Sequence, residues 1–272
     1  MGIAIRIRRI AAAVVLCATA MTLHAAEPTP LRVMFVGNSI TYVNNLPAVV
    51  SAYARAQPDG PPIETITYVA PGGTLHERWD DGAATAALRD RHVDVLVLQE
   101  RGAVLGCVQS EVDRASADCR DALAAHRAFA ELARTLGTRV LVLETWSTDA
   151  QGQSTQHDGA TRVAGRIGAT VVHAGDALQA QAHATSRAAT FPDGVHPSLG
   201  GTLVMGAQLY RAITGVAPTP TSLRIDFPLL PARPAVDPHV PLETQLVGLP
   251  VQVYLLEHDA LAPVLDRASR YH

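Results

Sequence analysis

The chain has 272 residues, of which 48% are hydrophobic and 17% charged, and its formal net charge is −3. This length allows one large domain or a domain with an extension, and the composition is typical of a soluble globular protein. Nucleic-acid-binding proteins usually carry a basic patch or stripe, so the negative balance predicts no nucleic-acid partner. The eleven histidines are neither clustered along the sequence nor set at a familiar metal-ligand spacing, so we expect no metal site.

The first 26 residues have the order of a secretory signal peptide. Three arginines within residues 6–9 precede an apolar stretch over 10–22, and Leu23-His24-Ala25-Ala26 follows it. A membrane anchor would need about 20 apolar residues, and a lipoprotein signal would have a small residue before Cys17, where a leucine stands. The sequence therefore predicts cleavage after Ala25 or Ala26, and a secreted or periplasmic protein without stable membrane insertion.

Removal of that segment leaves two cysteines, Cys107 and Cys119. They bracket a polar stretch over 108–118 that has no hydrophobic periodicity and resembles a loop. Two free cysteines acting as small core residues are the alternative. In a compartment that permits disulfides, we expect a Cys107–Cys119 bond.

Apolar runs alternate with amphipathic stretches along the rest of the chain. The five predicted strands lie at Leu31–Val36, Ile63–Val69, Val93–Leu98, Arg139–Leu143 and Ala169–His173. The third and fourth are near-continuous hydrophobic runs, which is typical of strands covered on both faces. Helices are expected after Asn45, over Asp121–Leu136, and between Ser198 and Gly215. This alternation predicts one α/β domain over residues 27–215, with helices on both faces of a parallel sheet.

The last part of the chain, from residue 216 to 272, is rich in proline. Such density opposes a continuous helix or a central strand. Val251–Leu256 is a candidate edge strand and Asp259–Ala268 a candidate terminal helix. We therefore expect a Pro-rich C-terminal extension that packs on the domain.

The pentapeptide Gly37-Asn38-Ser39-Ile40-Thr41 follows the first predicted strand. Ligands of parallel α/β sheets bind beyond the carboxyl ends of the strands, and the start of a helix offers N–H groups to a developing negative charge. Ser39 is therefore a candidate nucleophile, although a serine in an ordinary strand-to-helix turn would look the same. Thr41 stands where the nucleophile elbow of α/β-hydrolases has a glycine, which disfavours that family.

A second motif, Phe191-Pro192-Asp193-Gly194-Val195-His196-Pro197, supplies an acid and a base. A serine hydroxyl needs a base to remove its proton, and the imidazole needs an acceptor that fixes its tautomer. Asp193 and His196 are three residues apart on a tight loop and can meet in this way. A lone Asp-x-x-His is common and usually has no function, and as a metal site it lacks a third ligand.

Together and in this order, the two motifs resemble the SGNH/GDSL hydrolase superfamily over about residues 31–215. The resemblance implies a flavodoxin-like three-layer α/β/α sandwich with a five-stranded parallel sheet. It also implies that Ser39, Asp193 and His196 are the catalytic residues.

The same resemblance implies three hydrogen-bond donors to an oxyanion. One is Ser39, and a second is a glycine after the second strand, where Gly72 and Gly73 both lie and we favour Gly73. The third is an asparagine in a Gly-x-Asn-Asp context after the third strand. That context is absent here, and Gln99 is its natural substitute. The alternative for Gln99 is a strand-end polar residue satisfied by the backbone.

The two motifs and the predicted signal peptide thus predict an exported serine esterase that hydrolyses acyl esters, with no cofactor or metal. The family resemblance implies acetyl esters on carbohydrates as the expected substrates. One alternative is a lipase or thioesterase acting on longer acyl chains. Another is a carbohydrate-binding module that kept the fold without turnover, since the Gly-x-Asn-Asp is missing. Glu144, Thr145 and Trp146 follow the fourth strand and also face the site, whereas His157 and His173 are expected to be surface or satisfied histidines.

Overall fold

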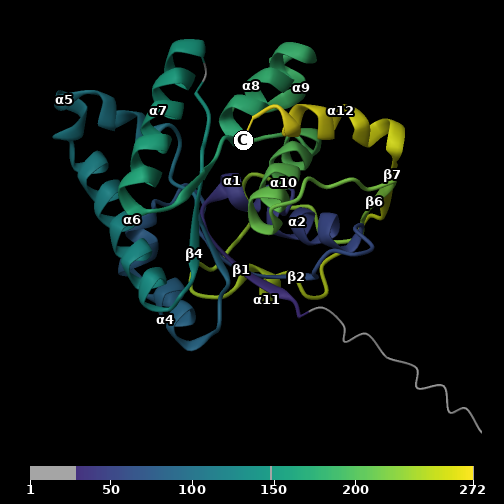
Figure 1. The fold of residues 1–272 in the computed structure, drawn as a ribbon, viewed down its shortest axis with the longest axis horizontal. Helices are drawn as coiled ribbons and strands as arrows, with labels where there is room; N and C mark the ends of the chain where they lie inside the picture. The colour runs from purple at the N-terminus through teal and green to yellow at the C-terminus, as the bar shows by residue number, and fades with distance from the viewer. Residues whose placement is uncertain (1–28, 148, 272) are drawn as a thin grey trace, which may run out of the picture.

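The computed structural model describes residues 29–147 and 149–271, and five parallel strands form its central sheet (Figure 1). The predicted signal peptide lies outside these residues. The strands are β1 (Leu31–Gly37), β2 (Ile63–Val69), β3 (Val95–Leu98), β4 (Arg139–Leu143) and β5 (Thr170–Val172), in the spatial order β2-β1-β3-β4-β5. The predicted three-layer α/β/α architecture is therefore confirmed, with all five strands near their expected positions.

Side chains alternate between two hydrophobic layers along β1. Val33 and Phe35 pack with the helices of one face, and Met34 and Val36 with those of the other, and all four are fully buried. Successive side chains of a strand point to opposite faces, so a strand covered on both faces has no exposed position for a polar residue. This is the physical reason for the continuous apolar run in the sequence.

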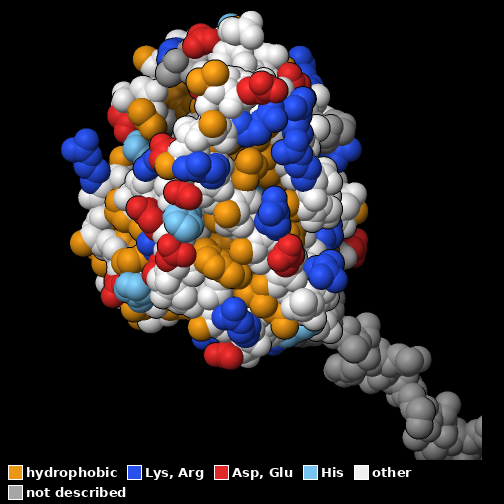
Figure 2. Space-filling view, turned by 90° about the vertical axis from the view of Figure 1, so that its left-hand side faces the viewer, with side chains coloured by type: hydrophobic (Ala, Val, Ile, Leu, Met, Phe, Trp, Pro, Cys, Tyr) orange, Lys and Arg blue, Asp and Glu red, His pale blue; other side chains and the backbone are white. Residues whose placement is uncertain are grey.

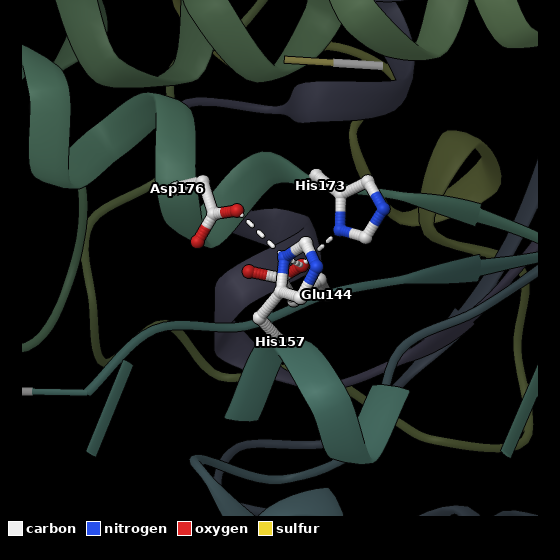
Figure 3. Close-up of side chains that lie close together, drawn as sticks. All are labelled: Glu144, His157, His173 and Asp176. Carbon is white, nitrogen blue, oxygen red and sulfur yellow. Dashed lines mark hydrogen bonds and ion pairs between the residues drawn. The ribbon is translucent and has the colours of Figure 1, made fainter. Parts of the chain in front are cut away.

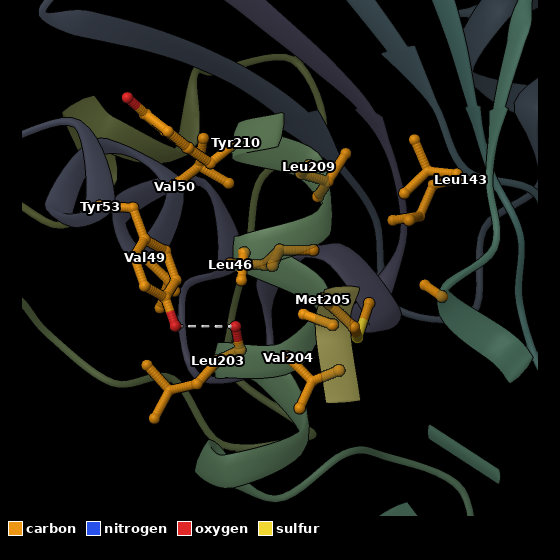
Figure 4. Close-up of a cluster of buried hydrophobic side chains, with 14 of the residues drawn as sticks. Leu46, Val49, Val50, Tyr53, Leu143, Leu203, Val204, Met205, Leu209 and Tyr210 are labelled. Atoms are coloured by element: carbon orange, nitrogen blue, oxygen red, sulfur yellow. Dashed lines mark hydrogen bonds between the residues drawn. The ribbon is translucent and has the colours of Figure 1, made fainter. Parts of the chain in front are cut away.

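Helices cover both faces of the sheet. In the described part of the chain the α-helices are α1 (Ser39–Tyr42), α2 (Leu46–Arg55), α3 (Leu75–Asp80), α4 (Ala83–Asp90), α5 (Glu111–Arg114), α6 (Ala117–Thr135), α7 (Ala150–Ile167), α8 (Ala174–Ala184), α9 (Arg187–Thr190), α10 (Leu199–Thr214), α11 (Leu242–Gln245) and α12 (His258–Ser269). One core contains side chains of α2, α8, α10 and α12, and in it α2 packs against α10 (Figure 4). There the Tyr53 hydroxyl donates a hydrogen bond to the Leu203 carbonyl at 3.1 Å.

The opposite face is covered by α3, α4, α6 and α7. Its outer surface, turned to the viewer in Figure 2, carries basic and acidic side chains interspersed with small apolar areas. Neither sign of charge occupies this face alone.

The strand order has its reversal between β1 and β3. From β1 the chain first moves to β2 on one side and then returns to β3 on the other. In open parallel sheets, the carboxyl ends of the strands at such a point border a crevice where ligands bind. Ser39 and Gln99 are among the residues that follow β1 and β3, so they lie where this strand order predicts a ligand site.

The C-terminal extension packs on this sandwich. β6 (Ser222–Ile225) and β7 (Tyr254–Glu257) form an antiparallel pair, and Leu223, Ile225 and Leu261 are fully buried in the core that contains α10. β7 and α12 lie close to the predicted strand and terminal helix, whereas β6 was not predicted.

The extension also covers an outer strand of the sheet. Glu243 of α11 accepts hydrogen bonds from the N–H of Thr67 at 2.9 Å and from its hydroxyl at 2.7 Å. Thr67 belongs to β2, whose outer backbone groups would otherwise be free to pair with another chain.

The region of the cysteines differs in part from the expectation. Cys107 and Cys119 form a disulfide with a Cα–Cα distance of 6.0 Å, as predicted. The stretch between them is not a plain loop: it contains the end of a 3-10 helix (Val104–Gln109) and α5, and α6 begins at Ala117. α5, capped by Ser110, has four residues, and only the first residues of α6, capped by Ser116, lie before Cys119. These helical pieces are too short for hydrophobic periodicity to be visible between the cysteines.

Candidate active site

Ser39 is the first residue of α1, directly beyond the end of β1. Asn38 precedes it in extended conformation and caps the helix, because its Oδ1 accepts a hydrogen bond from the Ile40 N–H at 3.1 Å. Its Nδ2 donates to the carbonyl of Gly73 at 2.9 Å. Asn38 is buried while Ser39 is partly exposed. The turn is therefore anchored in the protein interior by Asn38 and presents the serine hydroxyl at the surface.

The structure brings Ser39, His196 and Asp193 into one hydrogen-bonded chain. The Oγ of Ser39 lies 2.9 Å from Nε2 of His196, and Nδ1 of His196 lies 2.7 Å from Oδ2 of Asp193. A carboxylate can only accept hydrogen bonds, so the proton of the neutral imidazole resides on Nδ1. The lone pair of Nε2 is then available for the Ser39 hydroxyl proton, which is the arrangement that general-base catalysis requires.

Asp193 is held as a carboxylate. Partial burial opposes its ionisation, but hydrogen bonds from the backbone and imidazole of His196 and from the Val195 N–H outweigh this and lower its pKa from 3.8 to about 2. The same Oδ1 accepts the two backbone bonds, at 2.7 Å from His196 and 3.0 Å from Val195. The loop therefore stabilises the charge that orients the imidazole.

Two side chains outside the predicted set hold the His196 loop in place. The indole N–H of Trp146, a buried residue, donates to the Val195 carbonyl at 2.9 Å, so Trp146 supports the loop. Asn44 donates to the Pro197 carbonyl at 2.9 Å and connects the loop to the segment after α1. This role of Asn44 was not predicted from the sequence, although the Asn44-Asn45 pair was a signal: both residues have positive φ, which asparagine tolerates better than most residues.

The turn after β2 contains Gly72 and Gly73, and they differ in the availability of their N–H groups. The Gly73 N–H donates to the Ala70 carbonyl at 3.1 Å, and Gly73 is buried. Gly72 is exposed with φ of +66°, and its N–H has no acceptor among the residues that the structure describes. The structure therefore differs from our preference for Gly73 as an oxyanion donor, because the turn itself uses that N–H.

Gln99 also differs from its expected role. It is 1% exposed, and its Oε1 accepts hydrogen bonds from the Asn38 N–H at 3.0 Å and the Thr41 hydroxyl at 2.9 Å, while its Nε2 donates to the Glu100 carbonyl. The Asn38 N–H can only donate, so the amide must present its oxygen there. Gln99 thus braces the turn that carries Ser39, and its N–H group is directed to the end of β3.

Gly37 makes room for this brace. A Cβ atom at position 37 would lie 2.6 Å from Oε1 of Gln99 and 2.7 Å from Oγ1 of Thr41. Both contacts are far below van der Waals distance, so any other residue would displace the amide. The glycine two residues before the candidate nucleophile is therefore explained by the close approach of Gln99.

No protein-family model and no curated protein sequence matches the chain. Solved structures are similar in fold. The acetylxylan esterase Axe2 from Geobacillus stearothermophilus superposes with a TM-score of 0.55 at 15% identity, covering 69% of this chain and 95% of the esterase. A putative GDSL-like lipase from Parabacteroides merdae gives 0.51 at 15% identity, covering 69% of this chain and 97% of that one. An α/β hydrolase enzyme from the metagenome of Lake Arreo, Spain, gives 0.53 at 14% identity, with 68% and 96% covered.

Within residues 29–147 and 149–271, no helix has the length and apolar character needed to cross a membrane. The chain has a five-stranded parallel sheet, and the solved structures that are similar to it in fold include an acetylxylan esterase and a GDSL-like lipase. The chain has the fold of the SGNH/GDSL hydrolases, as the two sequence motifs predicted.

Proposed function

We propose that the chain is an exported serine esterase that hydrolyses short acyl esters, with acetyl groups on carbohydrates as its substrates. The observation that carries this proposal is the hydrogen-bonded chain from Ser39 through His196 to Asp193. Its three members come from two segments 157 residues apart in the sequence, and they meet at the carboxyl edge of the sheet, where α/β proteins bind ligands.

The mechanism follows from the atoms in this chain. His196 Nε2 takes the proton of the Ser39 hydroxyl as Oγ attacks the ester carbonyl, and the imidazolium then gives that proton to the leaving alcohol. Water, deprotonated in turn by His196, releases the acyl group from Ser39. Asp193 stays ionised and holds the Nδ1 proton, so it stabilises the imidazolium formed in each step.

Backbone N–H groups are our candidates for the oxyanion site. Ser39 opens α1, where the first N–H groups of a helix have no partner within the helix, and the Gly72 N–H is unpaired in the described part of the chain. Asn38 joins these two turns through its bond to Gly73. We assign the backbone N–H groups of Ser39 and Gly72 as the donors to the oxyanion. Gln99 and Asn38 hold in place the turns that carry these two groups.

The openness of the site and the similar structures support the acyl-ester substrate class. The Asp193 side chain is 47% exposed and Ser39 is partly exposed, so an ester on a large carbohydrate can reach the hydroxyl from solvent. Axe2, with the same fold, is an acetylxylan esterase, and two of its variants, one lacking a serine and one lacking an aspartate, are described as catalytic mutants.

Two features support export. Residues 1–26 have the charge and hydropathy order of a signal peptide, and Cys107 and Cys119 are paired. Disulfides persist in oxidising compartments and are rare in the cytosol of most organisms.

The decisive experiment is active-site labelling combined with ester hydrolysis. Wild-type protein should react with a fluorophosphonate probe at Ser39, located by peptide mass spectrometry, and should hydrolyse p-nitrophenyl acetate faster than the octanoate.

Ser39→Ala and His196→Ala should each lose this activity while remaining folded, and the double variant should be little worse, because members of a triad act as a unit. Ser269→Ala, at an exposed position on α12, is the matched control and should keep full activity. Hydrolysis retained in Ser39→Ala would exclude the assignment, and octanoate preference would favour a lipase.

A further inference from the structure

A second cluster of chemically active side chains lies at the ends of β4 and β5 and shares no residue with the Ser39–His196–Asp193 chain (Figure 3). Glu144 follows β4, His173 follows β5, Asp176 is in the first turn of α8 and His157 projects from α7. One nitrogen or oxygen of each residue lies within 4.8 Å of those of the other three. Neighbouring parallel strands end at the same edge of the sheet, so residues distant in the sequence converge there.

The contacts inside the cluster all involve one oxygen of each carboxylate. Oε2 of Glu144 lies 2.5 Å from Nδ1 of His173 and 3.7 Å from Nδ1 of His157. Oδ2 of Asp176 lies 2.7 Å from the same Nδ1 of His157. Two imidazole nitrogens and two carboxylate oxygens therefore converge, which is a donor set that divalent transition cations accept.

Gln153 holds the other oxygen of both carboxylates. Its Nε2 donates to Oε1 of Glu144 at 2.6 Å and to Oδ1 of Asp176 at 2.8 Å, and its own Oε1 is occupied by the Ser147 N–H at 3.1 Å. The amide thus turns Oε2 and Oδ2 towards the histidines. Outer hydrogen bonds of this kind orient the ligands of metal sites and tune their affinity.

Close packing leaves this arrangement little freedom. Glu144 has no exposed surface, and a Cβ atom at Gly175 would lie 2.6 Å from both Oε1 of Glu144 and Nε2 of Gln153. The glycine therefore allows α8 to approach the carboxylate and its amide partner.

The two carboxylates of the cluster need a positive counter-charge. The two carboxylates bring two negative charges into a site whose innermost member is fully buried, and a buried charge is costly unless it is paired. In the described part of the chain, the ion-pair partners of Glu144 and Asp176 are His157 and His173, and each supplies a positive charge only while it holds an additional proton. One divalent cation would balance both carboxylates with the imidazoles neutral.

We propose that Glu144, His157, His173 and Asp176 bind one divalent transition cation of the zinc type. Ligand atoms around tetrahedral zinc, at about 2.0–2.2 Å from the ion, are roughly 3.3 Å from each other. The nitrogen–oxygen contacts of 2.5, 2.7 and 3.7 Å lie on both sides of that spacing. Binding of the ion displaces the protons now held on the two Nδ1 atoms. The nitrogen and oxygen atoms of the 2.5 and 2.7 Å contacts then move apart by less than about 1 Å.

One ring must also turn. The imidazoles of His157 and His173 are stacked, with centroids 4.2 Å apart and planes 15° from parallel, and the lone pair of a ring nitrogen lies in the ring plane. His157 is the ring with space to rotate, since its side chain is 38% exposed against 13% for His173. His157 therefore closes the site over the ion.

The cation would fix the loop that supports the proposed catalytic histidine. Trp146 stands two residues after Glu144 and holds the Val195 carbonyl next to His196, and its ring lies against Phe191 with centroids 5.3 Å apart. The role is structural: the ion connects α7, α8 and the end of β4 without touching the ester. The site is independent of the esterase proposal and can fail separately from it.

Metal titration of the folded full-length mature chain tests the proposal. Protein treated with EDTA and desalted should bind one equivalent of Zn²⁺ by calorimetry and by elemental analysis, and its thermal midpoint should rise with added Zn²⁺. Replacing the zinc with Co²⁺ should give the visible absorption of a four-coordinate site. His157→Ala and His173→Ala should each weaken Zn²⁺ binding by more than tenfold, and Gln153→Ala by about 10–100-fold through the lost orienting bonds.

His92→Ala is the matched control, because His92 also pairs with an aspartate, Asp94, at 2.9 Å but belongs to no such cluster among the residues that the structure describes. It should bind Zn²⁺ as wild type does. Absence of saturable Zn²⁺ binding by the folded wild-type protein would overturn the proposal, and this result does not depend on the folding of any variant. Binding that survives unchanged in both His157→Ala and His173→Ala would also overturn it.

Discussion

The side chain of Asn38 joins the turn that presents Ser39 to the turn after β2, by donating from Nδ2 to the Gly73 carbonyl at 2.9 Å. Its Oδ1 at the same time caps α1 through the Ile40 N–H. One buried residue therefore sets the distance between the two N–H groups assigned to the oxyanion, those of Ser39 and Gly72. Pre-organised donors of this kind contribute to catalysis only while their geometry is maintained.

Asn38→Ser and Asn38→Ala separate the two bonds of Asn38. Serine keeps a cap acceptor for α1 but has no donor that reaches Gly73, whereas alanine loses both functions. We expect kcat on p-nitrophenyl acetate to fall in both variants, by up to roughly 10²-fold if the turns move by about 1 Å. The alanine variant should in addition lose about 1 kcal/mol of stability relative to serine, through the missing cap. Wild-type kcat in Asn38→Ser would show that the bond to Gly73 has no catalytic role.

Gln99→Ala distinguishes a brace from an oxyanion donor. The substitution leaves the buried Asn38 N–H and Thr41 hydroxyl without their acceptor, so urea unfolding should show a loss of about 1–3 kcal/mol, accompanied by lower kcat. A pure oxyanion donor would instead lower kcat by about 10²–10³-fold without affecting stability.

Gln99→Asn sharpens this test. The shorter side chain moves the amide oxygen away from the Asn38 N–H. If Gln99 acts as a brace, Gln99→Asn should behave like Gln99→Ala. If Gln99 is an oxyanion donor, Gln99→Asn should keep partial activity. Thr41→Val removes one of the two bonds to Oε1 and should show a smaller loss of stability than Gln99→Ala. Unchanged unfolding of Gln99→Ala together with a large fall in kcat would restore the donor role.

The disulfide should contribute measurably to stability. Its cysteines are 12 residues apart, and closing a loop of this size is worth about 3 kcal/mol in the chain-entropy model. Reduction, or the double change Cys107→Ser and Cys119→Ala, should lower the free energy of unfolding by about that amount, with alanine used at position 119 because Cys119 is fully buried. Two free thiols, found by mass spectrometry in protein from an oxidising compartment, would contradict the bond.

The sequence was sufficient for the features that depend on local pattern. Val33–Val36 and Leu96–Leu98 are buried on both faces, so their apolar runs identified the strands, and the Ser39 and Asp193–His196 motifs lie within short segments. The direction of the Gln99 amide was not predictable, because its partners Asn38 and Thr41 belong to a different strand end. The Glu144–His157–His173–Asp176 cluster was missed for the same reason: its members are spread over 33 positions and meet only when β4 and β5 align. Glu144, directly after the fourth predicted strand, and His173, the last residue of the fifth, were the available signal.

His126 should make the stability of the protein fall in mildly acidic solution. It is fully buried on α6, and burial lowers its pKa from 6.5 to about 4, although the hydrogen bond between Nδ1 and the Ala122 carbonyl opposes the shift. The unfolded chain therefore takes up this proton near pH 6.5 while the folded chain does not, so stability is complete above that pH and is lost as the pH falls towards 4. Over this interval the loss of stability attributable to His126 is about 3 kcal/mol.

Urea unfolding of wild type and His126→Leu in EDTA at pH 7, 5.5 and 4 measures this loss. The free energy of unfolding should depend less on pH in the variant, and His183→Leu, at an exposed position, should follow the wild type. Parallel profiles for wild type and His126→Leu would show that His126 is not the group that titrates.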